Sequence, residues 1–466
     1  MFPGITGWAI SLGIIFVVWI VLFVRRGPAE ALAPALLLSM AFPVWLKLTV
    51  FDVPFGVRTA TAALTMLAFA VHPRGRIWSP LTVLDLCVAL LCGSQILTDV
   101  WHDGFSIALP FRAYGEWALP YVAGRYAIRT QQDLVTAAKW ATGVVLFLSV
   151  LAVIENVTRV NVAELVFGER PEELAPRNMS RFNLKRAYAT AMHPIYFGLI
   201  LAVLSPWLVC LLDKRESKAS RGFVMFVVPI MLLGLMATIS KTPIMTVLGS
   251  WVFLLAIIVR WLRVPVMTIV VASIAVFLIW PYEVTDFFGR QSGERHRIIE
   301  VDGTAMVYSS SRARLLLPMA YAKAMTNAGM VGYGSEATKE FPLKIPYMEG
   351  TAETRDALKL VDNAYILIVL RMGWLGGFLL VLLLVTGMFS CWSLHRRRPD
   401  RLFPAAFLSL LIVYSILSLN LVSQVYDFFF TIAWTLGIIS ALLIQNSNSS
   451  LMSDFKPAFN APYRKS

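Results

Sequence analysis

Apolar residues in this chain are concentrated in long runs that are separated by polar connections. Several runs, such as 10–24, 191–212 and 264–280, approach the length of about 20 residues with which a helix crosses a membrane. They are continuous runs and not the single apolar stripe of a helix on a soluble protein. The pattern predicts thirteen membrane spans, at residues 5–24, 31–47, 57–71, 80–99, 107–124, 133–155, 190–212, 222–238, 242–260, 264–281, 362–392, 402–420 and 427–445.

The span at 107–124 has the weakest apolar pattern, because Arg112 and Glu116 interrupt it. We therefore expect an all-α polytopic membrane protein with twelve or thirteen transmembrane helices. Composition agrees with this fold class: 58% of the residues are hydrophobic, 15% are charged and the mean hydropathy is +0.69. A soluble domain carries nearer a quarter of charged residues.

The net charge of +13 would suggest a nucleic-acid partner if the chain were soluble. In a membrane protein the same excess is typical of cytoplasmic loops, where Lys and Arg collect. We therefore expect the protein to contact membrane lipids and not to bind nucleic acid. Basic residues fall in alternate short connections, which predicts a cytoplasmic C-terminus and an outward N-terminus in a bacterial inner membrane. These connections contain Arg25/Arg26, Arg74/Arg76, Arg125/Arg129, Lys214/Arg215/Lys218/Arg221, Arg260/Arg263, Arg396/Arg397/Arg398/Arg401 and Lys456/Arg464/Lys465.

Two connections are long, and both face the periplasm in this topology. The larger one contains as many acidic as basic residues, and long translocated loops escape the charge rule. A connection of this length usually has structure and function of its own. Residues 310–327 in it read as an amphipathic helix that ends at a glycine-rich turn. The predicted regions are N-terminal helices 1–155, first periplasmic loop 156–189, central helices 190–281, large periplasmic loop 282–361, C-terminal helices 362–445 and cytoplasmic tail 446–466.

Neither a disulfide nor a metal site is expected from the cysteines. Cys87, Cys92, Cys210 and Cys391 all lie in apolar stretches without ligand-type spacing, so we interpret them as buried thiols. The N-terminus lacks the basic leader of a signal peptide, and we expect the first helix to be retained.

Two candidate polar groups precede or interrupt spans in the first half of the chain. Arg112 and Glu116 stand one helical turn apart, either as a self-paired salt bridge or as part of a cavity for an anionic ligand. Arg186 precedes His193-Pro194, where the proline predicts a helix start whose N-terminus would attract an anion. A basic residue near lipid headgroups is an equally good interpretation of Arg186.

Two further groups lie around the large loop. Arg312 and Arg314 follow three serines, and a serine cap beside two guanidinium groups suits phosphate. Asp362 and Asn363 open a long apolar run, where they either cap a helix or present a carboxylate as a general base. In the second half of the chain, Lys241 also adds a cation in a tight outward turn, Thr238–Pro243.

Together these segments resemble the O-antigen polymerase and ligase superfamily of bacterial envelope glycosyltransferases. Residues 186–194 are similar to that family's Arg-x-x-Gly-Thr-x-x-x-Pro-Asn element, and Ser240-Lys241 to its Ser-Arg turn. Residues 311–334 are similar to its arginine helix with a Gly-Tyr-Gly turn. Asp362-Asn363-x-Tyr365 followed by Gly373-x-x-Gly376 is similar to its His-Asn-x-Tyr…Gly-x-x-Gly element, with Asp where ligases carry His.

The resemblance implies an enzyme of O-antigen, lipopolysaccharide or exopolysaccharide synthesis at the periplasmic membrane face. Its donor would be a glycan on undecaprenyl pyrophosphate, transferred to a glycan or lipid-linked acceptor by a polymerase or a ligase without cofactor or metal. Position in the motifs makes Arg186 and Arg312 the expected pyrophosphate ligands, supported by Arg112, Lys241 and Arg314. Asp362 ranks first and His193 second as the base, and the aspartate favours the polymerase branch.

Two other function classes stay open at this level. A transporter or flippase for a lipid-linked glycan would also need cationic cavity residues, although it rarely needs a loop of some 80 residues. A non-catalytic assembly component is the third alternative. The sequence does not distinguish partners such as a chain-length regulator or a separate flippase.

Overall fold

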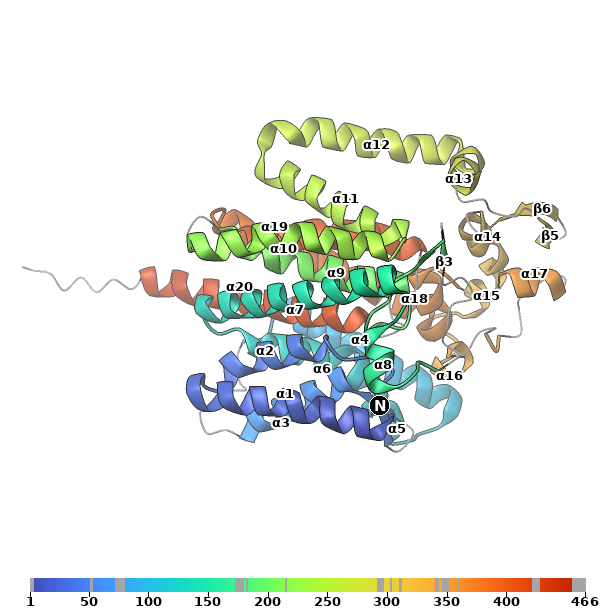
Figure 1. Ribbon diagram of the computed structural model, residues 1–466. Helices are drawn as coiled ribbons and strands as arrows, with labels where there is room; N and C mark the ends of the chain where they lie inside the picture. The colour runs from blue at the N-terminus through green and yellow to red at the C-terminus, as the bar shows by residue number, and fades with distance from the viewer. Residues whose placement is uncertain are drawn as a thin grey trace, which may run out of the picture.

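The computed structural model describes residues 4–50, 53–71, 80–171, 180–181, 183–213, 216–290, 297–301, 304–309, 312–339, 343–345, 352–358, 361–420 and 428–454. Helices dominate it, which confirms the all-α polytopic fold class (Figure 1). In the described part of the chain, eight helices are long and apolar enough to cross a membrane. They are α1 (Ile5–Arg26), α4 (Val83–Asp103), α7 (Gln131–Thr158), α10 (Lys218–Ala237), α11 (Lys241–Ile258), α12 (Arg263–Ile279, preceded by the 3₁₀ turn Arg260–Leu262), α18 (Ala364–Arg397) and α20 (Phe428–Asp454).

Shorter helices occupy the other predicted spans. They are α2 (Pro28–Ser39), α3 (Val57–Val71), α9 (Pro194–Cys210) and α19 (Leu402–Leu417). The weak span is helical too, as α5 (Ala108–Ala113), the π-helical turn η1 (Tyr114–Ala118) and α6 (Leu119–Ala127) in succession. The span predicted at 31–47 is shorter than expected, because α2 ends at Ser39 and the chain then enters a hairpin of β1 (Lys47–Val50) and β2 (Val53–Gly56).

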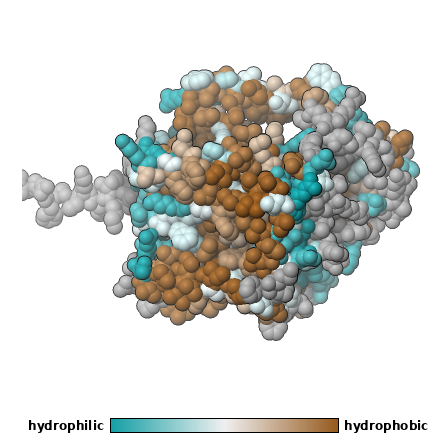
Figure 2. Space-filling view, in the orientation of Figure 1, coloured by the Kyte–Doolittle hydropathy of each residue, from teal (hydrophilic) through white to brown (hydrophobic). Residues whose placement is uncertain are grey.

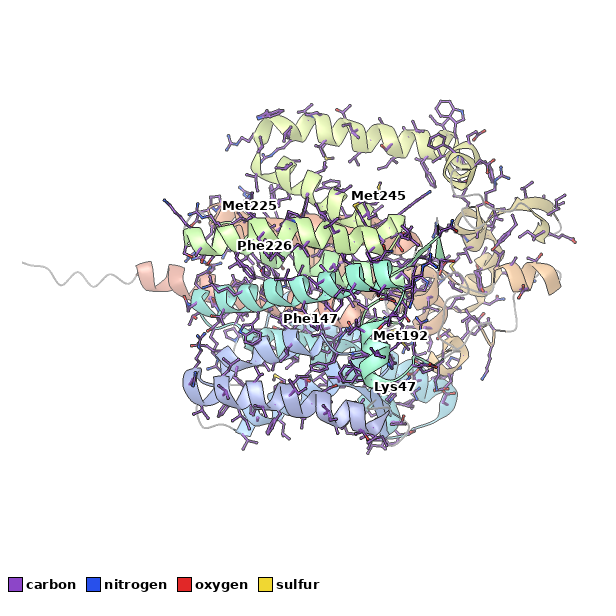
Figure 3. The ribbon with its side chains drawn as sticks, in the orientation of Figure 1. Lys47, Phe147, Met192, Met225, Phe226 and Met245 are labelled. Carbon is purple, nitrogen blue, oxygen red and sulfur yellow. The ribbon has the colours of Figure 1, made fainter. Side chains whose placement is uncertain are left out.

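The long helices run side by side (Figure 1), and the face of the bundle shown in Figure 2 carries a broad apolar belt across its middle. Met225 and Phe226 on α10 and Met245 on α11 are 69%, 60% and 60% exposed and belong to this belt (Figure 3). Exposed apolar surface of this extent is expected on helices that face lipid tails. Inside the bundle, α7, α9, α18, α19 and α20 share one core, in which Trp207 stacks on Trp434.

The segment after α12 extends beyond one end of the bundle, which we call the outer end (Figure 1). It contains α13 (Pro281–Arg290), α14 (Ala313–Ala320), α15 (Ala322–Asn327), α16 (Ser335–Thr338), α17 (Ala352–Ala357) and the hairpin of β5 (Arg297–Val301) and β6 (Thr304–Tyr308). The first outer connection adds α8 (Val162–Phe167) and the strand pair β3 (Ser180–Arg181) and β4 (Leu184–Lys185). The start of α1 lies at this same end, and α20 ends at the opposite one, as the predicted topology requires.

The helix predicted at 310–327 is present as two pieces, α14 and α15, that meet at Tyr321. Pro318 accounts for an interruption here, because it has no backbone N–H to donate within the helix. Ser310 and Ser311, at the predicted start, lie outside the described residues. The buried face of α14, with Leu316 and Leu317, belongs to one buried cluster with the first turns of α18.

Candidate functional site

The start of α18 meets the arginine helix α14 at the outer end of the bundle. Ile366, Leu367 and Leu370 of α18 share a small buried core with Leu316 and Leu317 of α14. Burial of such a face stabilises the contact by about 25 cal/mol per Å² of apolar surface. Two motifs that are some fifty residues apart in the chain are thereby held together.

Asn363, and not Asp362, caps α18. The Asn363 side chain accepts a hydrogen bond from the Ile366 amide at 3.0 Å, so the capping interpretation is correct for this residue. Asp362 precedes this cap and is partly exposed and partly surrounded by protein. This partial burial raises the pKa of Asp362, and the positive charge of Arg314 acts in the opposite direction.

Arg314 is therefore the arginine of α14 that lies near the candidate base. Its Nε is buried and has no hydrogen-bond partner among the described residues. An unsatisfied buried donor of this kind normally costs free energy, and it is expected where a ligand supplies the missing acceptor.

Arg312 is held by α13 in a bidentate pair. Its Nε and Nη2 donate to the two carboxylate oxygens of Asp286 at 2.6 and 2.5 Å, and its guanidinium carbon lies 5.4 Å from the ring centre of Tyr282. The Arg312 side chain is only 17% exposed. A guanidinium that grips a planar carboxylate in this way has the geometry that also grips phosphate.

The Gly-Tyr-Gly turn after α15 inserts into a break in α18. The amides of Tyr333 and Gly334 donate to the carbonyls of Leu370 and Arg371 at 2.7 and 3.0 Å. Gly373 has a φ of 67°, which opens the helix there. A Cβ on Gly332 would lie 2.4 Å from the Gly373 nitrogen, so only glycine permits this approach.

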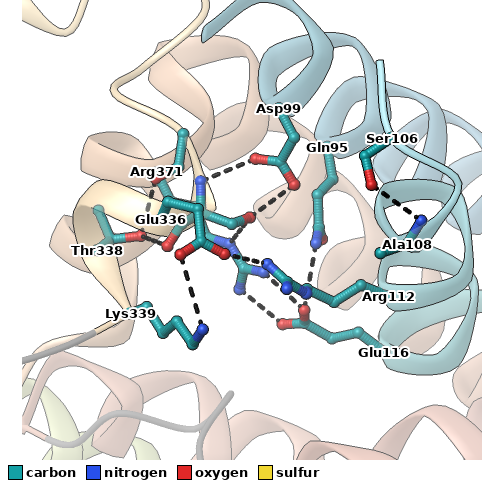
Figure 4. A network of polar contacts seen from close by, with 12 residues as sticks. Gln95, Asp99, Ser106, Ala108, Arg112, Glu116, Glu336, Thr338, Lys339 and Arg371 are labelled. Carbon is teal, nitrogen blue, oxygen red and sulfur yellow. Dashed lines mark hydrogen bonds and ion pairs between the residues drawn. The ribbon is translucent and has the colours of Figure 1, made fainter. Parts of the chain in front are cut away.

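A charged network fixes the same crossing (Figure 4). Arg371 donates from Nη1 and Nη2 to the two oxygens of Glu116 at 2.8 Å each, and from Nε to the Ser335 hydroxyl at 2.8 Å. The fully buried Asp99 of α4 accepts the Ser335 amide at 2.7 Å and its hydroxyl at 2.8 Å. The network joins α4, η1, α16 and α18 and thereby makes the outer turn part of the bundle.

Arg112 and Glu116 do not pair with each other. Arg112 instead binds Glu336 at 2.5 Å, and Lys339 lies 3.6 Å from the same carboxylate. The π-helical turn η1 between Arg112 and Glu116 changes their angular spacing, and each finds an oppositely charged partner from another element. The self-paired interpretation is therefore wrong. Sequence reasoning missed Asp99, Ser335 and Glu336. Glu336 binds Arg112 across 224 positions and Ser335 binds Asp99 across 236, and no local sequence pattern indicates such pairs.

Arg186 supports the turn between α10 and α11. It is 5% exposed, and it donates from Nε to the Thr238 carbonyl at 3.2 Å and from Nη2 to the Ser240 hydroxyl at 2.7 Å. Lys241 follows on the same turn and is exposed. The resemblance placed Arg186 and Ser240-Lys241 in separate elements, and the structure brings them together.

His193 caps α9, as the position of Pro194 predicts. Its Nδ1 accepts the amide of Ile195 at 3.1 Å. The neutral imidazole then carries its proton on Nε2. Neither ring nitrogen is thus left with a lone pair for an acceptor hydroxyl, which weakens the case for His193 as the base.

The predicted cations form three groups at the outer end. Arg314 lies near Asp362 while the adjacent Arg312 is paired with Asp286, Arg186 lies with Lys241, and Arg112 lies with the Arg371 network. Arg186 is bonded to the α10–α11 turn and Arg312 to α13, so the two expected pyrophosphate ligands are held by different elements. The described residues also contain no group of three His, Cys, Asp or Glu that could hold a metal ion, and their four cysteines carry free thiols.

The sequence model of one protein family, described as O-antigen ligase, matches residues 226–381. The match covers the α10–α11 turn with Lys241, the outer extension with Arg312 and Arg314, and the start of α18 with Asp362; Arg112 and Arg186 lie before it. No match was found among curated proteins. Over residues 226–381, which include the arginine helix, the start of α18 and the Gly-Tyr-Gly turn in the helix break, this multi-pass bacterial membrane protein thus matches the O-antigen ligase family, and the match supports the resemblance to the O-antigen polymerase and ligase superfamily.

Proposed function

We propose that the protein transfers a glycan from undecaprenyl pyrophosphate to an acceptor hydroxyl at the outer, periplasmic face of the inner membrane. The observation that carries this proposal is the junction of α14 with α18, where Arg314 lies within electrostatic range of Asp362 and has a buried, unsatisfied Nε. A carboxylate and a guanidinium close together suit a reaction that needs a base and a group that binds an anion.

In this reaction the acceptor oxygen forms a bond to the anomeric carbon of the donor glycan. The bond from that carbon to the pyrophosphate oxygen breaks, and the electron pair leaves with the lipid pyrophosphate. Stabilising the departing charge is most of the catalytic task. We assign that role to Arg312 and Arg314, with support from Arg186 and Lys241 at the α10–α11 turn and from Arg112, whose charge is shared with Glu336.

Asp362 takes the proton of the acceptor hydroxyl. An aspartate of ordinary pKa is a weak base at neutral pH. The partial burial that raises its pKa makes it a stronger base, and the charge of Arg314 acts in the opposite direction and favours the ionised form. Because this assignment places the outer end at the periplasmic face, the C-terminal end of α20, at the opposite end of the bundle, faces the cytoplasm.

The direct test supplies the purified protein with a synthetic lipid-pyrophosphate oligosaccharide and an acceptor. We expect longer glycans and one free lipid pyrophosphate for each bond formed, with or without a chelator. Movement of the lipid across a vesicle membrane without new glycosidic bonds would instead establish the transporter alternative. Inhibition by the chelator would mean that a divalent ion takes part.

Variants separate the arginine roles. Arg186→Ala and Arg312→Ala should each abolish chain extension while the protein still inserts in the membrane. Arg→Lys at either position should recover little, because a point charge cannot bind two phosphate oxygens at once. Asp286→Asn is the matched control for Arg312, since it removes the partner's charge and leaves the guanidinium. If both alanine variants kept full activity, the pyrophosphate assignment would be wrong.

A further inference from the structure

A second polar cavity lies at the end of the bundle opposite the outer extension. It has a volume of about 180 Å³ and lies between the start of α7, the end of α18, the start of α19 and the last turns of α20. At about 30 Å³ for each water, it has room for about six water molecules, which is also enough for one phosphate-sized group. None of the residues proposed for glycan transfer lines it.

Two arginines of one short turn face this cavity. Arg398 follows the last residue of α18, and Arg401 precedes α19; the Arg401 amide donates to the Arg398 carbonyl at 3.1 Å. This bond closes the turn, and both arginines line the cavity. Both side chains are half-buried, whereas Arg396 and Arg397 on the preceding turn are exposed and line no part of the cavity.

Neutral amides complete the polar lining. Gln131 opens α7, and Gln445 and Asn446 extend from α20. The Gln445 amide donates to the Ile128 carbonyl at 3.1 Å, which fixes it in the wall. Amide donors beside two guanidinium groups provide hydrogen bonds for several oxygens of one anion.

One carboxylate, Asp213, also lines the cavity. It accepts the amide of Leu402 at 2.9 Å and so caps α19, and it lies in the field of Arg401. Its negative charge is thus engaged with the helix N-terminus and with one arginine. The lining thus contains two guanidinium groups and one carboxylate, while the carboxylates of Glu216 and Asp400 act on Asp213 from outside the lining.

The floor of the cavity is apolar. Leu134, Leu442 and Phe403 come from three helices of the membrane core. A polar cavity with an apolar floor at the end of a bundle matches the boundary between lipid headgroups and tails. Basic pockets between transmembrane helices bind the phosphates of anionic lipids in this setting.

We propose that this cavity is a phosphate-binding site, which the headgroup of an anionic phospholipid in the adjacent leaflet occupies through Arg398 and Arg401. The ligand ties the α18–α19 turn to α7 and α20. Since α18 also carries the break at Gly373 and the Asp362 junction, the lipid would stabilise the helix on which the outer site is built.

The test uses purified, delipidated full-length protein and its thermal unfolding. Short-chain phosphatidylglycerol should raise the Tm, and short-chain phosphatidylcholine and inorganic phosphate at the same concentration should not. Arg398→Gln with Arg401→Gln should weaken phosphatidylglycerol binding about thirtyfold, because two cations are lost. Arg396→Gln with Arg397→Gln removes the same charge outside the cavity and should leave the affinity unchanged.

Equal stabilisation by inorganic phosphate would mean that the free anion is the ligand, which overturns the lipid assignment. Equal loss in both double variants would mean that only net charge matters, which overturns the site. In case the double variant folds poorly, a photoactivatable phosphatidylglycerol is cross-linked to the unaltered protein. Label in peptides around residues 394–404 and 442–446 supports the site, and label found elsewhere refutes it. Neither measurement depends on glycan transfer.

Discussion

Arg371 and Glu116 form a bidentate ion pair that joins residues 255 positions apart, with both Nη–Oε distances at 2.8 Å. The pair lies beside the break in α18, and its two side chains are 14% and 19% exposed. Removal of one partner from a largely buried pair leaves the other charge uncompensated. The stability of the outer crossing should therefore depend on both residues together.

We expect Arg371→Met to destabilise the protein by about 3 kcal/mol. The double variant Arg371→Met/Glu116→Leu should lose less than the single one, because no unpaired carboxylate remains. Thermal unfolding in detergent measures both, with Arg396→Met on the exposed last turn of α18 as control. A double variant less stable than the single one would contradict this account.

Gly332→Ala should expel the Gly-Tyr-Gly turn from the helix break, since its Cβ would lie 2.4 Å from backbone atoms of α18. Hydrogen exchange at the Tyr333 and Gly334 amides should then become faster. Gly329→Ala is a matched control, because Gly329 also has a positive φ, of 57°, but open space around it. If the two variants exchanged alike, backbone strain alone would explain the glycine and the close approach would be irrelevant.

Ser240→Ala tests how Arg186 acts. The change removes the 2.7 Å hydrogen bond that Arg186 makes to the turn and leaves the guanidinium in place. If Arg186 contacts the pyrophosphate itself, chain extension should fall only a few-fold, against complete loss in Arg186→Ala. An equal loss in both variants would make Arg186 a positioning residue for the turn that presents Lys241.

Asp362→Asn should lower the rate of glycan transfer by about 10²- to 10⁴-fold, the range lost with a general base. In the unaltered protein the rate should fall as the pH drops through the pKa of Asp362, which is raised above the usual 3.8. His193→Asn should stay active, because asparagine also caps a helix. If His193→Asn were inactive and the rate of the unaltered protein fell as the pH dropped through about 6.5, the histidine would be the base.

Because of the Arg112–Glu336 pair, we expect the fold to lose stability at acidic pH. The hydrogen bond from Arg112 lowers the pKa of Glu336 below its usual 4.5. A group whose pKa is lower in the folded state stabilises the fold above the unfolded pKa, and this contribution is lost as the pH falls through the folded value. The Tm should thus fall below pH 4.5 by more in the unaltered protein than in Glu336→Gln. If the Tm of the unaltered protein and that of Glu336→Gln fell equally with pH, the Arg112–Glu336 pair would not contribute to stability.

The sequence determined the membrane fold, because long apolar runs are a local property and lipid leaves a backbone few choices other than helix. It also located the arginine helix, the helix start at Pro194, the cap at the start of α18 as one of two alternatives, and the glycine turn, each of which depends on a few neighbouring residues. The order of the motifs between residues 180 and 377 indicated the superfamily, and the match of the O-antigen ligase family over residues 226–381 supports it.

Only the tertiary structure decided which charges pair. Arg112 could have bound Glu116 within its own helix, and the π-helical turn with the approach of α16 gave it Glu336 instead. Asp99 and Ser335 looked unremarkable in sequence, yet they join the outer turn to α4. Ion pairs depend on distances of a few ångströms between segments far apart in the chain, and such distances are fixed by helix packing and not by local sequence.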